Sequence, residues 1–71
     1  MNDIMKALKS QYEADIAKAN ANIQVYIMNP AGIGEHPDIC SAVDSQVQLV
    51  AEAEDKLHVI NDYYVTPTSL T

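Results

Sequence analysis

The sequence predicts an all-α protein, a two-helix antiparallel hairpin that oligomerisation completes to a helical bundle. Residues 1–29 and 38–66 contain no glycine and no proline, whereas the segment between them holds both glycines and two of the three prolines. Glycine and proline are the strongest breaks in a sequence. Apolar residues recur at spacings of three and four in both long stretches, as on one face of a helix. A chain of 71 residues has a marginal core alone, and small chains often add partners.

The first helix is expected over residues 3–28, with Asn2 or Asp3 as its N-terminal cap. It ends at Asn29, because a residue before proline is pushed out of the α region and Pro30 follows. Its core-facing stripe contains Ile4, Leu8, Tyr12, Ile16, Ala19, Ile23 and either Tyr26 or Ile27.

The loop is expected over residues 29–37. Pro37 suits the first position of the next helix, where its missing N–H costs nothing. Asp38 then lies near the positive end of that helix dipole. A short loop between two helices favours antiparallel packing.

The second helix is expected over residues 38–64, so the hairpin spans 1–66 and residues 65–71 form an irregular tail. Its stripe contains Ile39, Val43, Gln46 or Val47, Val50, Ala53, Leu57, Ile60 and Tyr64, widened by Ala42 and Leu49. We expect Val47 in the core and Gln46 at its margin, although a buried Gln46 would fix helix register. The opposite side is polar and acidic, with Asp44, Gln48, Glu52, Asp55 and Asp62.

A second stripe on the first helix lies roughly opposite the large one. Its members are mostly small: Ala7, Ser10, Ala14, Ala17, Ala21, Val25 and Met28. Small side chains let helix backbones approach closely, so we predict an oligomer contact through Ala7, Ala14, Ala17, Ala21, Val25 and Met28. The competing explanation is that alanine is simply the best helix former on a surface.

The net charge of −6 comes from the second half of the chain, which contains seven acidic residues and a single basic residue, Lys56. Binding of phosphates needs clustered lysine and arginine, and the sequence contains no arginine, so we expect no nucleic acid partner. No apolar run approaches the roughly 20 residues of a membrane span. A single cysteine fits a reducing compartment. We therefore expect a cytoplasmic protein without membrane contact.

The candidate chemistry is sparse, and we expect no catalytic site, cofactor or metal. A stable metal site needs about three or four ligands in a fixed shell. Glu35, His36 and Asp38 are close in sequence, but His58 is expected far from the loop. Cys40 lacks an evident base and is expected at the edge of the core.

Two resemblances involve the loop. The triplet His36-Pro37-Asp38 resembles the one that J-domain co-chaperones carry between two antiparallel helices, but the basic helix of those domains is missing. The segment Asn-Pro-Ala-Gly-Ile-Gly-Glu-His-Pro-Asp at 29–38, with Ala-Glu-Ala-Glu-Asp-Lys-Leu at 51–57, is similar to short uncharacterised proteins of contractile-tail phages of marine bacteria and cyanobacteria. This resemblance implies a viral origin, a helical hairpin and, if phage-encoded, a location in the host cytoplasm. It implies no functional residues.

From these observations we expect a small non-enzymatic interaction or structural protein that acts as a homo-oligomeric bundle. The loop residues Ile33, Glu35, His36 and Asp38 are a candidate recognition surface. One alternative is an acidic regulator that binds a host protein through its second helix. Another is a J-domain-like co-chaperone that acts through His36-Pro37-Asp38.

Overall fold

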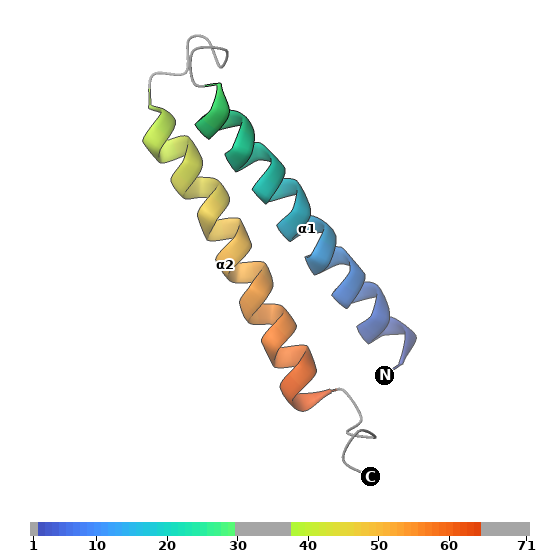
Figure 1. Ribbon diagram of the computed structural model, residues 1–71. Coiled ribbons are helices and arrows are strands. Elements are labelled where there is room, and N and C mark those ends of the chain that lie inside the picture. The colour runs from blue at the N-terminus through green and yellow to red at the C-terminus, as the bar shows by residue number, and fades with distance from the viewer. Residues whose placement is uncertain (1, 30–37, 65–71) are drawn as a thin grey trace.

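The computed structural model describes residues 2–29 and 38–64, and within these ranges the protein is an antiparallel pair of helices (Figure 1). Helix α1 spans Asp3–Met28 and helix α2 spans Ile39–Tyr63. The all-α hairpin predicted from the sequence is confirmed. The rest of the predicted loop, residues 30–37, and the predicted tail, residues 65–71, lie outside the described ranges.

Helix α1 begins and ends through local hydrogen bonds. At its start the backbone N–H of Met5 donates to Oδ1 of Asn2 at 2.8 Å, so Asn2 is the capping residue. At its end the N–H of Asn29 donates to the carbonyl oxygen of Val25 at 3.0 Å. The capping bond satisfies one of the N–H groups that the first turn of a helix leaves without an internal partner.

Helix α2 begins one residue later than the sequence predicts, because Asp38 is its cap. The N–H of Ser41 donates to Oδ1 of Asp38 at 2.9 Å, and the Ser41 hydroxyl donates to Oδ2 at 2.7 Å. The first helical position is therefore Ile39, and Pro37, which was expected there, lies outside the described residues. At the other end Tyr64 is the C-terminal cap, with its N–H on the carbonyl oxygen of Ile60 at 2.9 Å.

Two side-chain contacts between the helices show their register. The side-chain nitrogen of Lys56 lies 5.2 Å from the centre of the Tyr12 ring, and the amide nitrogen of Asn22 donates to Oε1 of Gln46 at 3.1 Å. Moving ten residues along α1, from Tyr12 to Asn22, moves the partner ten residues back along α2. This is the relation expected of an antiparallel pair in continuous register.

The buried interior is small. Among the described residues only Ala19, Ala53 and Ile60 are buried, with exposed fractions of 2%, 4% and 5%. Two of these three are alanines, and no large side chain is completely shielded from solvent. Burial of Ile60 contributes about 2 kcal/mol, which is little for a whole fold. The remaining seam residues are half-buried: Met5, Leu8, Lys9, Tyr12, Ile16, Ile23, Tyr26, Ile39, Ala42, Val43, Gln46, Val50 and Leu57.

The predicted stripe of helix α2 needs one main correction. Gln46 is half-buried in the seam, whereas Val47 is 49% exposed, which reverses the expected order. Gln46 bonds to Asn22 across the seam, so its polar end has a partner there. Leu49 is 49% exposed and Tyr64 is 54% exposed, so these two lie outside the seam.

Helix α1 shows a smaller shift of its stripe. Ile4, expected in the core, is 69% exposed, and Met5 takes the half-buried position beside it. Between the two candidates near the end of the helix, Tyr26 is half-buried and Ile27 is 59% exposed.

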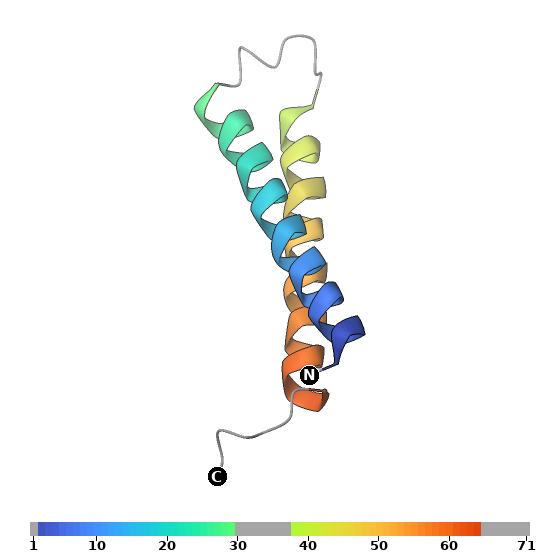
Figure 2. The ribbon, with the colours of Figure 1, turned by 90° about the vertical axis from the view of Figure 1, so that its right-hand side faces the viewer.

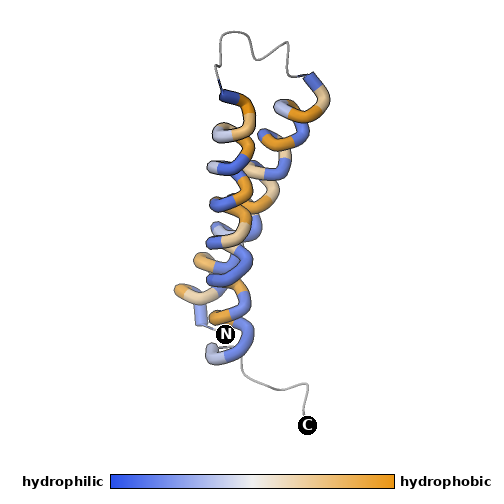
Figure 3. The backbone as a smooth tube through the Cα atoms, turned by 90° about the vertical axis from the view of Figure 1, so that its left-hand side faces the viewer, coloured by the Kyte–Doolittle hydropathy of each residue, from blue (hydrophilic) through white to orange (hydrophobic). Residues whose placement is uncertain are grey.

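The hairpin is elongated. Helix α1 has 26 residues and is therefore about 39 Å long at 1.5 Å per residue. The helices cross and diverge toward the end where the loop joins them (Figure 2). Apolar bands recur along both helices between polar ones (Figure 3). Near the loop, Ile23, Tyr26, Ile39 and Val43 are half-buried.

We expect Asp38→Ala to lower the free energy of unfolding by about 1 kcal/mol, the usual value of a helix cap. The substitution removes the acceptor of two hydrogen bonds from Ser41. Chemical denaturation at one fixed protein concentration measures the change. Asp44→Ala is the control, because Asp44 is exposed further along the same helix, and its effect should stay within about 0.5 kcal/mol. Equal losses in both variants would contradict the capping role.

Candidate functional site

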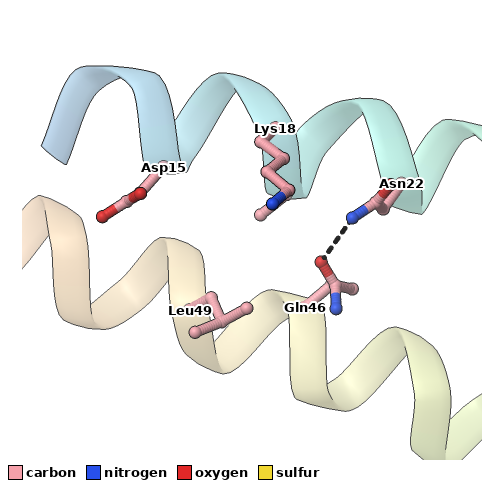
Figure 4. Close-up of a pocket in the computed structure, with 6 residues that line it drawn as sticks. Asp15, Lys18, Asn22, Gln46 and Leu49 are labelled. Carbon is pink, nitrogen blue, oxygen red and sulfur yellow. Dashed lines mark hydrogen bonds between the residues drawn. The ribbon is translucent and has the colours of Figure 1, made fainter. Parts of the chain in front are cut away.

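A surface groove lies across the middle of the seam. Its volume is about 400 Å³, and it is lined by Asp15, Lys18, Ala19, Asn22, Gln46 and Leu49. Asn22 and Gln46 point toward each other across the groove, while Asp15 and Lys18 project from α1 (Figure 4). We call this side of the hairpin the Leu49 face. It combines side chains of both charges with the apolar side chains of Ala19 and Leu49.

The Asn22–Gln46 hydrogen bond is the polar contact described between the two helices at this groove. It joins residues 24 positions apart in the chain, with the Asn22 nitrogen 3.1 Å from the Gln46 oxygen. Asn22 is itself exposed on α1. The helical pattern alone did not indicate its partner, because Gln46 was expected at the core margin. A polar residue in an apolar seam is typical of a register-setting contact.

A second groove lies toward the free ends of the helices. It has a volume of about 230 Å³ and is lined mainly by apolar side chains: Met5, Leu8, Tyr12, Asp55, Lys56, Val59, Ile60 and Tyr64. Lys56 lies over the Tyr12 ring here, and its aliphatic stem can cover apolar surface beneath its charge. Tyr63 and Tyr64 follow at the helix end, with ring centres 6.4 Å apart and planes tilted by 58°.

The small stripe of α1 faces solvent. Ala7, Ala14, Ala17, Ala21, Val25 and Met28, together with Ser10, are all exposed. Val25 is 53% and Met28 77% exposed, so the stripe carries apolar surface at its end near the loop. The contact between chains that the sequence predicts at this stripe stays a prediction.

Of the four candidate recognition residues of the loop, the structure places one. Asp38 caps α2, which accounts for an acidic residue at this position without a partner protein. Ile33, Glu35 and His36 lie outside the described residues.

The two other residues that the sequence analysis singled out are on the surface. Cys40 is exposed, so the expectation that it lies at the edge of the core is wrong. It falls on the outward side of α2 because the seam positions in its turn are taken by Ile39 and Val43. His58 is likewise exposed, on the last third of α2.

A search of residues 2–29 and 38–64 finds no group of three or more histidine, cysteine or acidic side chains placed to hold a metal ion. In the same part of the chain neither helix is long and apolar enough to cross a membrane. No protein-family model, curated protein or solved structure matches the sequence or the fold.

The structure exposes further large apolar residues besides Val25 and Met28 of the small stripe. Near the loop these are Ile27, Val47 and Leu49, and toward the free ends they are Ile4, Val59, Tyr63 and Tyr64. The signals in the sequence were the two core positions with two adjacent candidates each, Tyr26 or Ile27 on the first helix and Gln46 or Val47 on the second.

We expect Gln46→Leu to raise the free energy of unfolding by about 0.5–1 kcal/mol. The added apolar atoms would lie in the half-buried seam, and their gain exceeds the net value of one exposed hydrogen bond. Gln48→Leu is the control, since Gln48 bonds only to Glu52 one turn along the exposed side of α2 in the described contacts. Denaturation at fixed concentration measures both. A loss above about 1 kcal/mol for Gln46→Leu would mean that the bond is required for pairing.

Proposed function

We propose that the protein is a small, non-enzymatic assembly protein whose hairpins associate with one another to complete a helical bundle. The observation that carries this proposal is the size of the buried interior. Only Ala19, Ala53 and Ile60 are buried within the described ranges, while nine large apolar side chains there are exposed. A helix pair in contact along one seam leaves the outer half of each apolar stripe in water, and further helices would cover it.

The exposed fractions of these nine large apolar side chains support the same proposal. Among the described residues these side chains are 43–77% exposed, with Met28 at 77%, Tyr63 at 76% and Ile4 at 69%.

The polar contacts in the described residues have structural purposes. Asn2 and Asp38 cap the helices, and Asn22 bonds to Gln46 across the seam. These contacts favour a role in assembly over a role in chemistry. The resemblance to short phage proteins suggests a context for this proposal. The protein would be a phage component that is made in the cytoplasm of an infected host. Mass spectrometry of purified particles of a phage that encodes the chain tests whether it is part of the virion.

We expect the solution mass to exceed the 7.8 kDa of one chain and to fall toward it on dilution. Light scattering coupled to size-exclusion chromatography, over about a hundredfold range of concentration, measures this, because such dilution shifts a coupled association equilibrium by roughly 2.7 kcal/mol. The helix content from circular dichroism should fall together with the mass. A fully helical chain of single-chain mass at every concentration would contradict the proposal.

We further expect the mass to persist between roughly 0.05 and 1 M salt, because salt screens exposed charges but strengthens or leaves unchanged the burial of apolar surface. The same light-scattering measurement, repeated across salt concentrations, checks this. An assembly that dissociates at high salt would instead depend on the acidic side of α2, which is formed by exposed Asp44, Gln48, Glu52, Asp55 and Asp62.

A further inference from the structure

The two sides of the hairpin differ in charge near the loop. The Leu49 face carries the mixed-charge groove with Asp15 and Lys18. Successive residues turn by about 100° around a helix axis. Val47 is therefore about 160° from Leu49 around α2, and Ile27 is about 140° from Asn22 around α1. Since Leu49 and Asn22 both line the groove, Val47 and Ile27 share the other side of the hairpin.

That other side is uncharged and mostly apolar in the half of the hairpin near the loop. The polar Asn20 also belongs to it, since Asn20 is exposed and within about 20° of Ile27 around α1. Ile27 and Val47 are 59% and 49% exposed at its edges. Half-buried branched side chains lie between them. The members of this surface, which we call the Val47 patch, are Ile16, Ile23, Ile27, Val43, Val47 and Val50.

The Val47 patch is also free of charged groups. In residues 16–28 and 39–51 the only charged side chains are Lys18, which lines the groove of the Leu49 face, and Asp44, on the acidic outward side of α2. Toward the free ends the equivalent positions are charged. Lys9 is on the same line of α1 as Ile27, and Glu54 is within about 20° of Val47 around α2.

We propose that the Val47 patch is the surface on which a second copy of this chain docks, patch against patch. This inference rests on the assembly proposed above and assigns its contact surface. A C2 contact uses the same surface on both copies, so it must be self-complementary. An uncharged surface of branched side chains meets that requirement, because no like charges are brought together and no charged group is buried.

A second copy fits the patch better than a foreign protein, because the patch is complementary to itself and offers no charge by which a charged partner would be selected. The small stripe of α1 is a poorer candidate, because alanine side chains have little apolar area to bury.

Substitution of one exposed residue at a time by glutamate distinguishes which surface forms the contact between copies. Val47→Glu and Ile27→Glu place a carboxylate in the proposed contact from α2 and from α1. Leu49→Glu is the matched control, because Leu49 and Val47 are both 49% exposed in the same helix. Ala14→Glu tests the small stripe of α1. Each variant is measured by light scattering and circular dichroism, at a concentration at which the unchanged chain is assembled.

We expect Val47→Glu and Ile27→Glu to weaken association on the order of 100-fold, because each leaves an unpaired carboxylate in an apolar contact. Leu49→Glu and Ala14→Glu should retain the mass of the unchanged chain. If Val47→Glu aggregates or does not fold at all, Ile27→Glu decides the question from the other helix.

Three results would overturn this inference. Dissociation by Leu49→Glu or Ala14→Glu, with Val47→Glu still assembled, would move the contact to another face and leave the proposed function standing. Equal dissociation by all four variants would mean that no face is specific. A single-chain mass for the unchanged protein at every concentration would overturn both this inference and the proposed function.

Discussion

A pair of helices in contact along one seam can shield only one narrow strip of each, and this geometric limit governs the rest of the structure. Within the described ranges only three residues are buried in that strip, and two of them are the alanines Ala19 and Ala53. Small side chains at the contact allow the helix axes to lie close together. The larger residues on either side of the alanines then reach solvent at the margins. The half-buried residues at the margins of each apolar stripe therefore contribute to the contact between the helices, in addition to the few residues that are buried.

The sequence was sufficient for the architecture because the signals at that level reinforce one another. The Gly- and Pro-free stretches, the spacing of the apolar residues and the capping residue Asn2 all indicate the same helix pair. The misplaced positions lie where two neighbouring apolar or polar residues compete for one place in the seam. Met5 takes the place expected for Ile4, and Gln46 the place expected for Val47.

Those errors share a physical cause. A helical pattern locates a stripe to within about one residue, or 100°, but the crossing of the two axes decides which member of a neighbouring pair faces inward. Gln46 faces inward at the position where Asn22 offers a hydrogen-bond donor across the seam. That contact links residues far apart in the chain, so the sequence around either residue does not indicate it. The candidate surfaces were harder to predict from the sequence. The Val47 patch consists of residues from both helices, and the sequence pattern alone does not give the register that brings them together.

Part of the unusual loop motif has a structural explanation. Asp38, the last residue of the His-Pro-Asp triplet, accepts two hydrogen bonds from Ser41 and begins helix α2. A capping residue before a long helix needs no partner protein to account for it.

The distribution of tyrosines has an optical consequence. The chain contains four tyrosines and no tryptophan, so its near-ultraviolet spectrum comes from those side chains. Tyr12 and Tyr26 lie half-buried in the seam, one in each half of the hairpin, while Tyr63 and Tyr64 are exposed at the end of α2. Any event that opens or closes the seam near the loop changes the surroundings of Tyr26 first. The signal of the exposed pair, Tyr63 and Tyr64, serves as an internal reference. Tyr12 and Tyr26 then report in which half of the hairpin the helices separate.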